Sequence, residues 1–231
     1  MKTIGLQDQD YICDISAPCF QMLSQQELEI VRESKTQVLF RRGDSLTKQG
    51  AFASYILFVI NGLCRQYIEG YDGKSYNLRV IQPGEFVGLS QVFTKNIYSY
   101  STVALTSCQA FLVEKEVIAR LIKSNGEFGL NIIKRYCEVN SNLFAKLSTV
   151  LYKQMNGRIA ESLLYLDSLK PSHPDIFQLL SRKDIAEFAG VSTESAVKLL
   201  KNFEKDGLIS LNEKDIVILK SDALAEISLK G

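Results

Sequence analysis

The sequence predicts an α+β fold in three parts: an N-terminal antiparallel β-roll (jelly roll), a long helix and a C-terminal winged helix-turn-helix. Three observations lead to this prediction. Over residues 36–113, turns that contain glycine separate short β-rich runs. Residues 130–156 have apolar side chains at a helical spacing and contain no Pro or Gly. Residues 181–208 contain two helical segments with capping residues, and a glycine lies between them. A chain of 231 residues, 46% hydrophobic and 23% charged, can form more than one packed domain.

The first part, residues 1–126, is predicted from its turn signals. The β-rich runs between the turns are Ile56–Ile60, Leu63–Ile68, Tyr76–Ile81 and Val103–Val113. Many short strands at regular spacing are typical of an antiparallel sandwich or jelly roll. Asp72-Gly73 lies between two of the runs and predicts a hairpin there. We expect flanking helices at Gln25–Glu33 and Lys115–Lys123.

The second part, residues 127–156, is predicted to be a dimerisation helix that leads into a hinge at 154–158. One apolar stripe, with Lys146 at its single gap, comprises Ile132, Tyr136, Val139, Leu143 and Val150. A second stripe comprises Ile133, Cys137, Phe144, Leu147 and Leu151. Both stripes must be buried, and steps of three and four residues favour a parallel two-stranded coiled coil. We expect the first stripe to form the interface of a homodimer; the alternative is the central helix of a monomer.

The third part, residues 157–231, contains the signals of two short helices. Ser181 and Asp184 form a capping box, Gly190 favours a helix end, and Ser192 caps a second helix over Thr193–Lys205. The runs Leu208–Leu211 and Ile216–Leu219 then flank a polar turn and predict a β-hairpin. Helices joined by a tight glycine turn and followed by such a hairpin are typical of a winged helix-turn-helix.

A helix-turn-helix places its second helix in the major groove of DNA, so double-stranded DNA is the predicted partner. The candidate reading side chains on the outer face of that helix are Thr193, Glu194, Ser195, Val197, Lys198 and Lys201. Glu194 can accept a hydrogen bond from cytosine N4, and Lys198 can donate to guanine or to a phosphate. The alternative role of Glu194 is to interact with the helix dipole. The candidate phosphate anchors are Arg182, Lys183 and Lys214.

Composition and motifs exclude several other classes of protein. The net charge is +1, so DNA binding must depend on a local surface. No Walker loop, GxSxG or HExxH motif is present, and we do not expect an enzyme. No apolar stretch approaches the roughly 20 residues of a membrane span, and no membrane partner is expected. An odd number of scattered cysteines, five, favours a reducing compartment, so we expect a cytoplasmic protein.

Six short motifs follow one another in the order seen in a known family. They are residues Phe40–Asp44, Ile56–Gly62, Pro83–Gly88, Asn156–Ala160, Leu180–Ala186 and Val191–Ser195. With the order of the three parts, they resemble the CRP/FNR family of bacterial transcription regulators over nearly the whole chain. The resemblance implies a sensor domain of the cyclic-nucleotide-binding type, a homodimer, base reading by Glu194 and a functional partner in RNA polymerase.

The chain departs from this family where a cyclic nucleotide would bind. Leu89 and Ser99 stand where the resemblance implies a ribose-binding glutamate and a phosphate-binding arginine, and no arginine occurs between Arg79 and Arg120. A buried phosphate without a guanidinium is costly, so we do not expect cyclic AMP to bind. An effector pocket, either closed or open to a more apolar ligand, is expected from Phe86, Gly88, Leu89, Ser90, Tyr98, Ser99, Tyr100, Leu143 and Phe144.

Two cysteines raise the alternative of a redox or iron–sulfur sensor. Cys13 and Cys19 have a spacing similar to two cluster ligands of the family, but the other two positions hold Asp10 and, three residues early, Cys108. We therefore expect no cluster, metal or other cofactor. A thiol redox switch at Cys13 and Cys19 is an interpretation that lies between an iron–sulfur cluster and two cysteines without a role. A nucleotide-sensing regulatory module without DNA binding is the last alternative, but it would keep the arginine and lack the hairpin.

Overall fold

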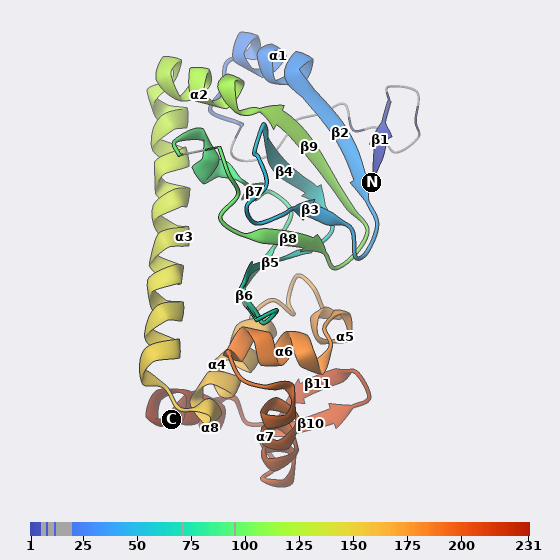
Figure 1. Cartoon of the computed structure of the whole chain (residues 1–231), viewed down its shortest axis with the longest axis vertical. Coiled ribbons are helices and arrows are strands. Elements are labelled where there is room, and N and C mark those ends of the chain that lie inside the picture. The colour runs from blue at the N-terminus through green and yellow to red at the C-terminus, as the bar shows by residue number, and fades with distance from the viewer. Residues whose placement is uncertain (6–7, 9–11, 13–19, 71, 95) are drawn as a thin grey trace. The chain divides into compact units, whose positions relative to one another are not determined.

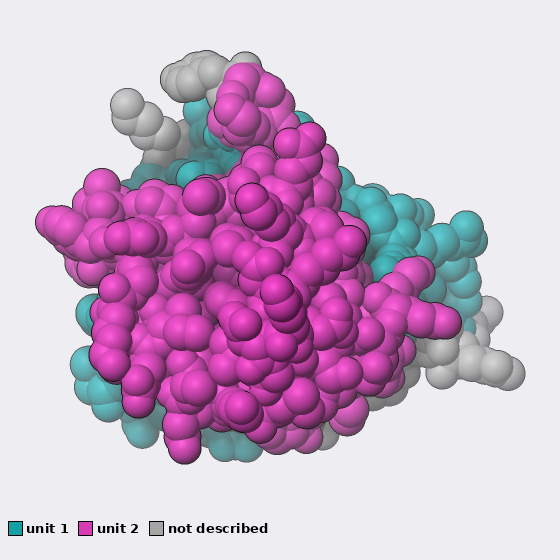
Figure 2. All heavy atoms as spheres, turned by 90° about the horizontal axis from the view of Figure 1, so that it is seen from below, with its two compact units in different colours: residues 1–69, 79–141 teal, residues 70–78, 142–231 magenta. Residues whose placement is uncertain are grey.

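The computed structural model describes residues 1–5, 8, 12, 20–70, 72–94 and 96–231 (Figure 1). The chain forms two compact units, coloured separately in Figure 2. The first contains residues 1–69 and 79–141, and the second contains 70–78 and 142–231.

The first unit is a roll of two antiparallel sheets with helices on one side (Figure 1). Its larger sheet has the order β1 (Lys2–Ile4), β2 (Lys35–Phe40), β9 (Cys108–Glu114), β4 (Tyr55–Asn61), β7 (Phe86–Val87). The smaller sheet has the order β3 (Ser45–Thr47), β8 (Ser101–Ala104), β5 (Cys64–Glu69), β6 (Ser75–Ile81), and the last three residues of β6 belong to the first unit. The remaining elements are α1 (Gln25–Ser34), η1 (Leu89–Val92), α2 (Lys115–Ser124) and the start of α3 (Gly126–Tyr152).

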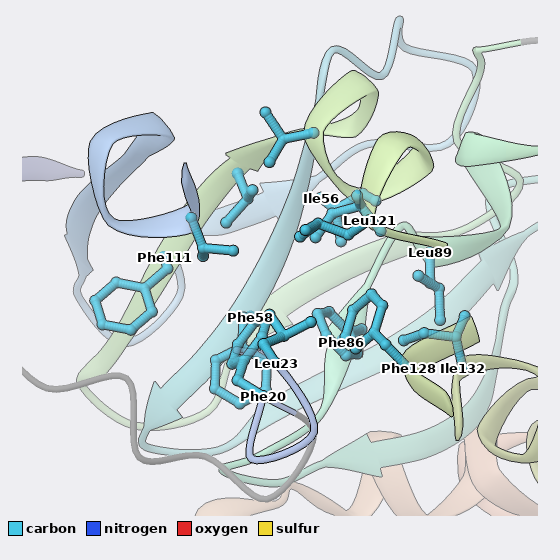
Figure 3. Packing of buried hydrophobic residues seen from close by; sticks show 14 residues of the cluster. Phe20, Leu23, Ile56, Phe58, Phe86, Leu89, Phe111, Leu121, Phe128 and Ile132 are labelled. Atoms are coloured by element: carbon cyan, nitrogen blue, oxygen red, sulfur yellow. The ribbon is translucent and has the colours of Figure 1, made fainter. Parts of the chain in front are cut away.

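A cluster of large apolar side chains, which we call the helix-side cluster, joins the larger sheet to the helices (Figure 3). Phe20 contacts Phe58 edge to face at 5.1 Å between ring centroids and stacks with Phe128 of α3 at 6.3 Å. Ile132, one turn further along α3, belongs to the same cluster and is 1% exposed. This burial fixes which face of α3 packs against the sheet.

The interior of the roll, between the two sheets, forms a second apolar cluster. Its buried members are Val38, Phe40, Leu57, Val59, Cys64, Ile81, Val87, Ala104, Cys108 and Ala110. Phe86 and Val87 are consecutive in β7, so the pleat directs them to opposite faces of the sheet. Phe86 accordingly joins the helix-side cluster, whereas Val87 joins the interior of the roll.

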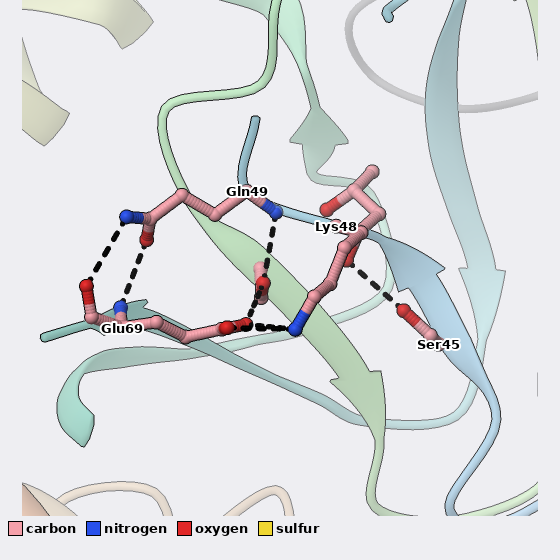
Figure 4. Close-up of polar contacts among 6 residues, drawn as sticks. Ser45, Lys48, Gln49 and Glu69 are labelled. Atoms are coloured by element: carbon pink, nitrogen blue, oxygen red, sulfur yellow. Dashed lines mark hydrogen bonds and ion pairs between the residues drawn. The ribbon is translucent and has the colours of Figure 1, made fainter. Parts of the chain in front are cut away.

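Glu69, the last residue of β5, is held by a polar network (Figure 4). Its carboxylate accepts from Ser101 Oγ at 2.5 Å and pairs with Lys48 Nζ at 2.6 Å. The Gln49 side chain also bonds both backbone groups of Glu69, at 2.8 and 3.2 Å. The Lys48 hydrogen bond is the main reason that the pKa of Glu69 lies below its ordinary value. The network joins the loop after β3 to the ends of β5 and β8.

The second unit is mainly helical. After the end of α3, its elements are α4 (Met155–Asp167), α5 (Ile176–Leu179), α6 (Arg182–Ala189), α7 (Thr193–Lys205), β10 (Ile209–Asn212), β11 (Asp215–Ile218) and α8 (Ser221–Lys230). The central helix α4 contacts α6, α7 and α8, and its buried face includes Ile159, Leu163 and Leu166.

The predicted α+β fold class is confirmed, and two local predictions are corrected. The expected strand Val103–Val113 is two strands in different sheets, because the N–H groups of Leu105 and Thr106 turn to the carbonyl of Leu63. The helical period of 130–156 breaks after Tyr152, where Arg158 donates to the carbonyls of Val150 and Lys153 at 2.6 and 2.8 Å. The side chain thereby satisfies carbonyls that a helix end leaves unpaired.

Among the described residues, no helix is long and apolar enough to cross a membrane.

The helix-side cluster gives the first testable prediction. Phe128→Ala should lower the free energy of unfolding by about 3–5 kcal/mol, because it leaves a cavity at a fully buried position. Phe93→Ala, at a phenylalanine that is 61% exposed, is the matched control and should change it little. Urea denaturation followed by circular dichroism measures both. Equal effects would contradict the assigned packing of α3.

Candidate nucleic-acid interface

Local capping explains why α6 and α7 begin and end where they do. Asp184 N donates to Ser181 Oγ at 3.1 Å while Ser181 N donates to Asp184 Oδ2 at 2.7 Å, which completes the predicted capping box of α6. Gly190 ends α6 in the left-handed region, at φ 63°. Ser192 Oγ then accepts from Ser195 N at 3.1 Å and starts α7. The predicted helix-turn-helix geometry is confirmed in both helices and in the turn.

Tyr76 and Asn77, which belong to the second unit, contact α6 and the turn that follows it. Asn77 Nδ2 donates to the carbonyl of Asp184 at 2.9 Å. The ring of Tyr76 lies so close to Gly190 that a Cβ built there would be 3.1 Å from a ring carbon. Burial raises the pKa of Tyr76 to about 12. Sequence reasoning missed both residues, because the only local signal was the hairpin turn Asp72-Gly73.

The outer edge of α7 is open to solvent. Its inner face is buried through Ala196, Leu200 and Phe203. Of the predicted reading side chains, Thr193, Glu194, Lys198 and Lys201 are exposed, as is Asn202. Ser195 and Val197 are half-buried, and the Ser195 hydroxyl accepts from Ser192 Oγ at 2.9 Å. The first two turns of α7 thus present one carboxylate and one ammonium group, Glu194 and Lys198, to solvent.

The predicted hairpin is present as β10 and β11, which pair from Ile209↔Ile218 to Asn212↔Asp215. Arg182, one of the expected phosphate anchors, donates from Nη2 to the carbonyl of Glu213 at 3.0 Å, in the hairpin turn. Its guanidinium therefore joins α6 to the hairpin, and burial lowers its pKa. Lys183 is exposed and lies 3.8 Å from Glu187 on its own helix; Lys214 is exposed in the turn.

The residues expected to line an effector pocket have different environments, and they are divided between the two units. Phe86 and Leu89 are buried in the helix-side cluster. Tyr100 packs on the interior of the roll, where its Oη accepts from Gly88 N at 2.8 Å. Tyr98 is buried and donates to the carbonyl of Tyr55 at 2.8 Å. The other four are distributed as follows: Ser90 is half-buried and Ser99 exposed in the first unit, and Leu143 and Phe144 are exposed in the second.

A polar group near the roll interior was not predicted from the sequence. Arg79 forms an ion pair with Glu85 and donates from Nε to Gln66 Oε1 at 2.8 Å. Glu85 also accepts from Gln82 N at 2.7 Å. The guanidinium of Arg79 is thus bonded on two sides within the same unit.

The members of the first stripe of α3 differ in burial: Ile132 is buried, Val139 is half-buried, and Tyr136 and Leu143 are exposed. Ile132, the first member of the expected dimer stripe, lies in the core of its own chain, so its assignment to a dimer interface is wrong. Lys146, at the gap of that stripe, lies 4.8 Å from the ring of Tyr165 in α4, and Val150 is half-buried. The exposed line one residue further on comprises Leu130, Ile133, Cys137, Asn140, Phe144, Leu147 and Leu151. We call this line the outer stripe; its steps of three and four residues are unbroken.

Cys13 and Cys19 lie outside the described residues. Within the described part of the chain, no group of three or more His, Cys, Asp or Glu side chains is placed to hold a metal ion.

Comparison with known proteins agrees with this arrangement of domains. The family model of the cyclic nucleotide-binding domain matches residues 37–125, and that of the Crp-like helix-turn-helix domain matches residues 157–227. The cAMP-activated global transcriptional regulator CRP of Pasteurella multocida is 26% identical over 178 residues, which are 75% of this chain and 85% of that protein.

Two solved structures have a similar fold. A protein of Eubacterium rectale, assigned to transcriptional regulators of the CRP/FNR family, superposes with a TM-score of 0.76 at 18% identity over 92% of this chain and 98% of that one. The c-di-GMP-responsive global regulator CLP of Xanthomonas campestris gives a TM-score of 0.73 at 22% identity over 84% of this chain and 99% of that one.

The turn between α6 and α7 gives the second prediction. Gly190→Ala should lower the free energy of unfolding of the second unit by about 1–2 kcal/mol, because a Cβ disfavours the left-handed conformation. The contact with Tyr76 adds to this cost. In a Tyr76→Leu background this contact is absent. Gly190→Ala should therefore lower the free energy of unfolding by less there than in the wild-type chain. Urea denaturation of the four proteins measures it; equal losses in both backgrounds would contradict the contact.

Proposed function

This chain is a member of the CRP/FNR family of transcription regulators, and we propose that it acts as a homodimer that reads a pseudo-palindromic DNA site with α7. The observation that carries the proposal is the exposed polar edge of α7, next to a hairpin wing, in a Crp-like helix-turn-helix domain. In a dimer the two copies of α7 would enter successive major grooves about 34–36 Å apart.

Base reading is assigned to the start of α7. Glu194 and Lys198 are one turn apart and exposed, in the part of a recognition helix that approaches base edges. Thr193, Lys201, Lys183 and Lys214 are exposed and suit contacts with phosphates or sugars. Arg182 has a different role: it positions the wing through the Glu213 carbonyl. RNA polymerase is the proposed functional partner of the DNA-bound dimer, and no catalytic activity is proposed.

The dimer is assigned to the outer stripe of α3. In heptad terms, Leu130, Cys137, Phe144 and Leu151 occupy a positions, and Ile133, Asn140 and Leu147 occupy d positions. The stripe is continuous, whereas the first stripe packs on its own chain at Ile132 and Lys146. Apart from Asn140 the stripe is apolar. Leaving it in water would be unfavourable, and a second copy of α3 presents a matching surface.

We propose that cyclic AMP is not the effector of the β-roll. Leu89 is buried in the helix-side cluster and offers no hydrogen bond to a ribose. Arg79, on β6, is already paired with Glu85 and Gln66. A cyclic phosphate would need a cation that is available to pair with it. Regulation by another ligand, or by none, is compatible with the DNA-binding role.

Glu194→Ala gives the third prediction. Selection of bound sites from random DNA with the purified protein first defines the preferred operator. The variant should then lose about 1–3 kcal/mol of discrimination at one base pair of each half-site, because its carboxylate acceptor is gone. Affinity for unrelated DNA should change little, as measured by fluorescence anisotropy. Glu226→Ala, at an exposed glutamate of α8, is the matched control. Loss of specific and non-specific binding together would argue against base reading by Glu194.

Leu147→Glu gives the fourth prediction. A carboxylate in the outer stripe should convert the dimer to a monomer, because it would be buried without a partner in the coiled coil. Asn142→Glu, on the same helix but off the stripe, should leave the dimer intact. Sedimentation equilibrium measures both. If Leu147→Glu stays dimeric while Tyr136→Glu dissociates, the first stripe forms the interface instead.

A further inference from the structure

Two cysteines 44 positions apart in sequence meet inside the β-roll. Their Sγ atoms are 3.5 Å apart, and both side chains are fully buried. Cys64 is the first residue of β5 in the smaller sheet, and Cys108 is the first residue of β9 in the larger sheet. The pair therefore lies where one end of the two sheets comes together.

The backbone around the pair holds the sulfur atoms in place. The Cys108 thiol donates to the carbonyl of Leu63 at 3.0 Å, and Leu63 N donates to Thr106 Oγ1 at 2.9 Å. Gly62 covers the pair: a Cβ there would lie 2.7 Å from Cys108 Sγ and 2.2 Å from the Ser107 carbonyl oxygen. Only glycine fits this close approach, at φ 85°.

The two thiols differ in acidity. The hydrogen bond from Cys64 lowers the pKa of Cys108. The same contact, together with burial, raises the pKa of Cys64. Because the thiolate is the nucleophile, Cys108 is the better attacking sulfur, whereas Cys64 keeps its proton more firmly. Cys108 also directly follows Ser107, which is exposed, so a local opening of the turn over 105–107 gives a small oxidant access to it.

We propose that Cys64 and Cys108 are a modification site that forms a reversible intrachain disulfide when the protein meets a hydroperoxide. In the first step the Cys108 thiolate attacks the terminal oxygen of the hydroperoxide and the O–O bond breaks. Cys108 becomes a sulfenic acid, and the leaving oxygen takes the proton that the Cys108 thiol gave up and departs as an alcohol or, from hydrogen peroxide, as water. In the second step Cys64 sulfur attacks Cys108 sulfur, the S–O bond breaks, and the hydroxyl takes the Cys64 proton and leaves as water. Overall, two thiols and one hydroperoxide give a disulfide, an alcohol and water.

To form the product, the sulfur atoms must approach from 3.5 Å to about 2.05 Å. The disulfide would link the two sheets covalently. This site is distinct from Cys13 and Cys19, and the inference does not rest on DNA binding or on the dimer.

Peptide mapping of the full-length protein tests the proposal. Reduced, folded protein is treated with increasing hydrogen peroxide, its remaining thiols are alkylated, and it is digested without reductant for mass spectrometry. We expect a cross-linked pair of peptides containing Cys64 and Cys108, two hydrogens lighter than the reduced pair and lost on treatment with dithiothreitol. Cys137→Ala should retain the cross-link, because Cys137 is exposed on α3.

Single variants separate the two roles. Cys64→Ala should accumulate a sulfenic acid at Cys108 that dimedone traps, whereas Cys108→Ala should leave Cys64 unoxidised at the same peroxide dose. Cys64→Ser and Cys108→Ser provide the same readout if an alanine variant does not fold by circular dichroism. The proposal is overturned if Cys108 cross-links to Cys13 or Cys19 instead, if the Cys64–Cys108 bond forms only in urea, or if both thiols stay reduced while Cys137 is oxidised.

Discussion

The packing of this protein depends on which apolar side chains of α3 are buried within the chain and which are exposed. The helix is 27 residues long and carries apolar side chains on two neighbouring lines. Ile132 and Phe128 anchor one line in the helix-side cluster, and near the other end Lys146 packs over Tyr165. The outer stripe, from Leu130 to Leu151, is exposed to solvent among the described residues. A second copy of the same helix is the partner that the heptad spacing favours.

The helix-turn-helix could be predicted almost completely from the sequence, because its signals are local. Ser181, Gly190 and Ser192 act on backbone groups within four residues of themselves. Side chains that act at a distance were beyond such reasoning. Arg182 bonds a carbonyl 31 residues away, and Asn77 bonds one 107 residues away. Neither partner has a sequence pattern that points to it, since both acceptors are backbone oxygens.

In the β-roll, contacts distant in sequence matter more than local signals. Its strands and turns could be predicted as a class, but their pairing depends on contacts distant in sequence. The run through residues 103–113 is β-rich throughout, and only the capture of two N–H groups by Leu63 divides it between two sheets. Similarly, Phe86 and Val87 are both apolar, so nothing in their sequence says which one faces the helices. In a strand, a shift of one residue exchanges the buried and the exposed side.

These contacts also bear on how the β-roll can act as a sensor. Arg79 is paired with Glu85, so an anionic ligand that binds Arg79 would compete with this ion pair. The proposed thiol chemistry needs no pocket of ligand size, since a hydroperoxide reacts with one sulfur and leaves. A covalent bond between β5 and β9 would act on the ends of both sheets at once. In that proposal the roll responds through its own side chains and not through a bound ligand.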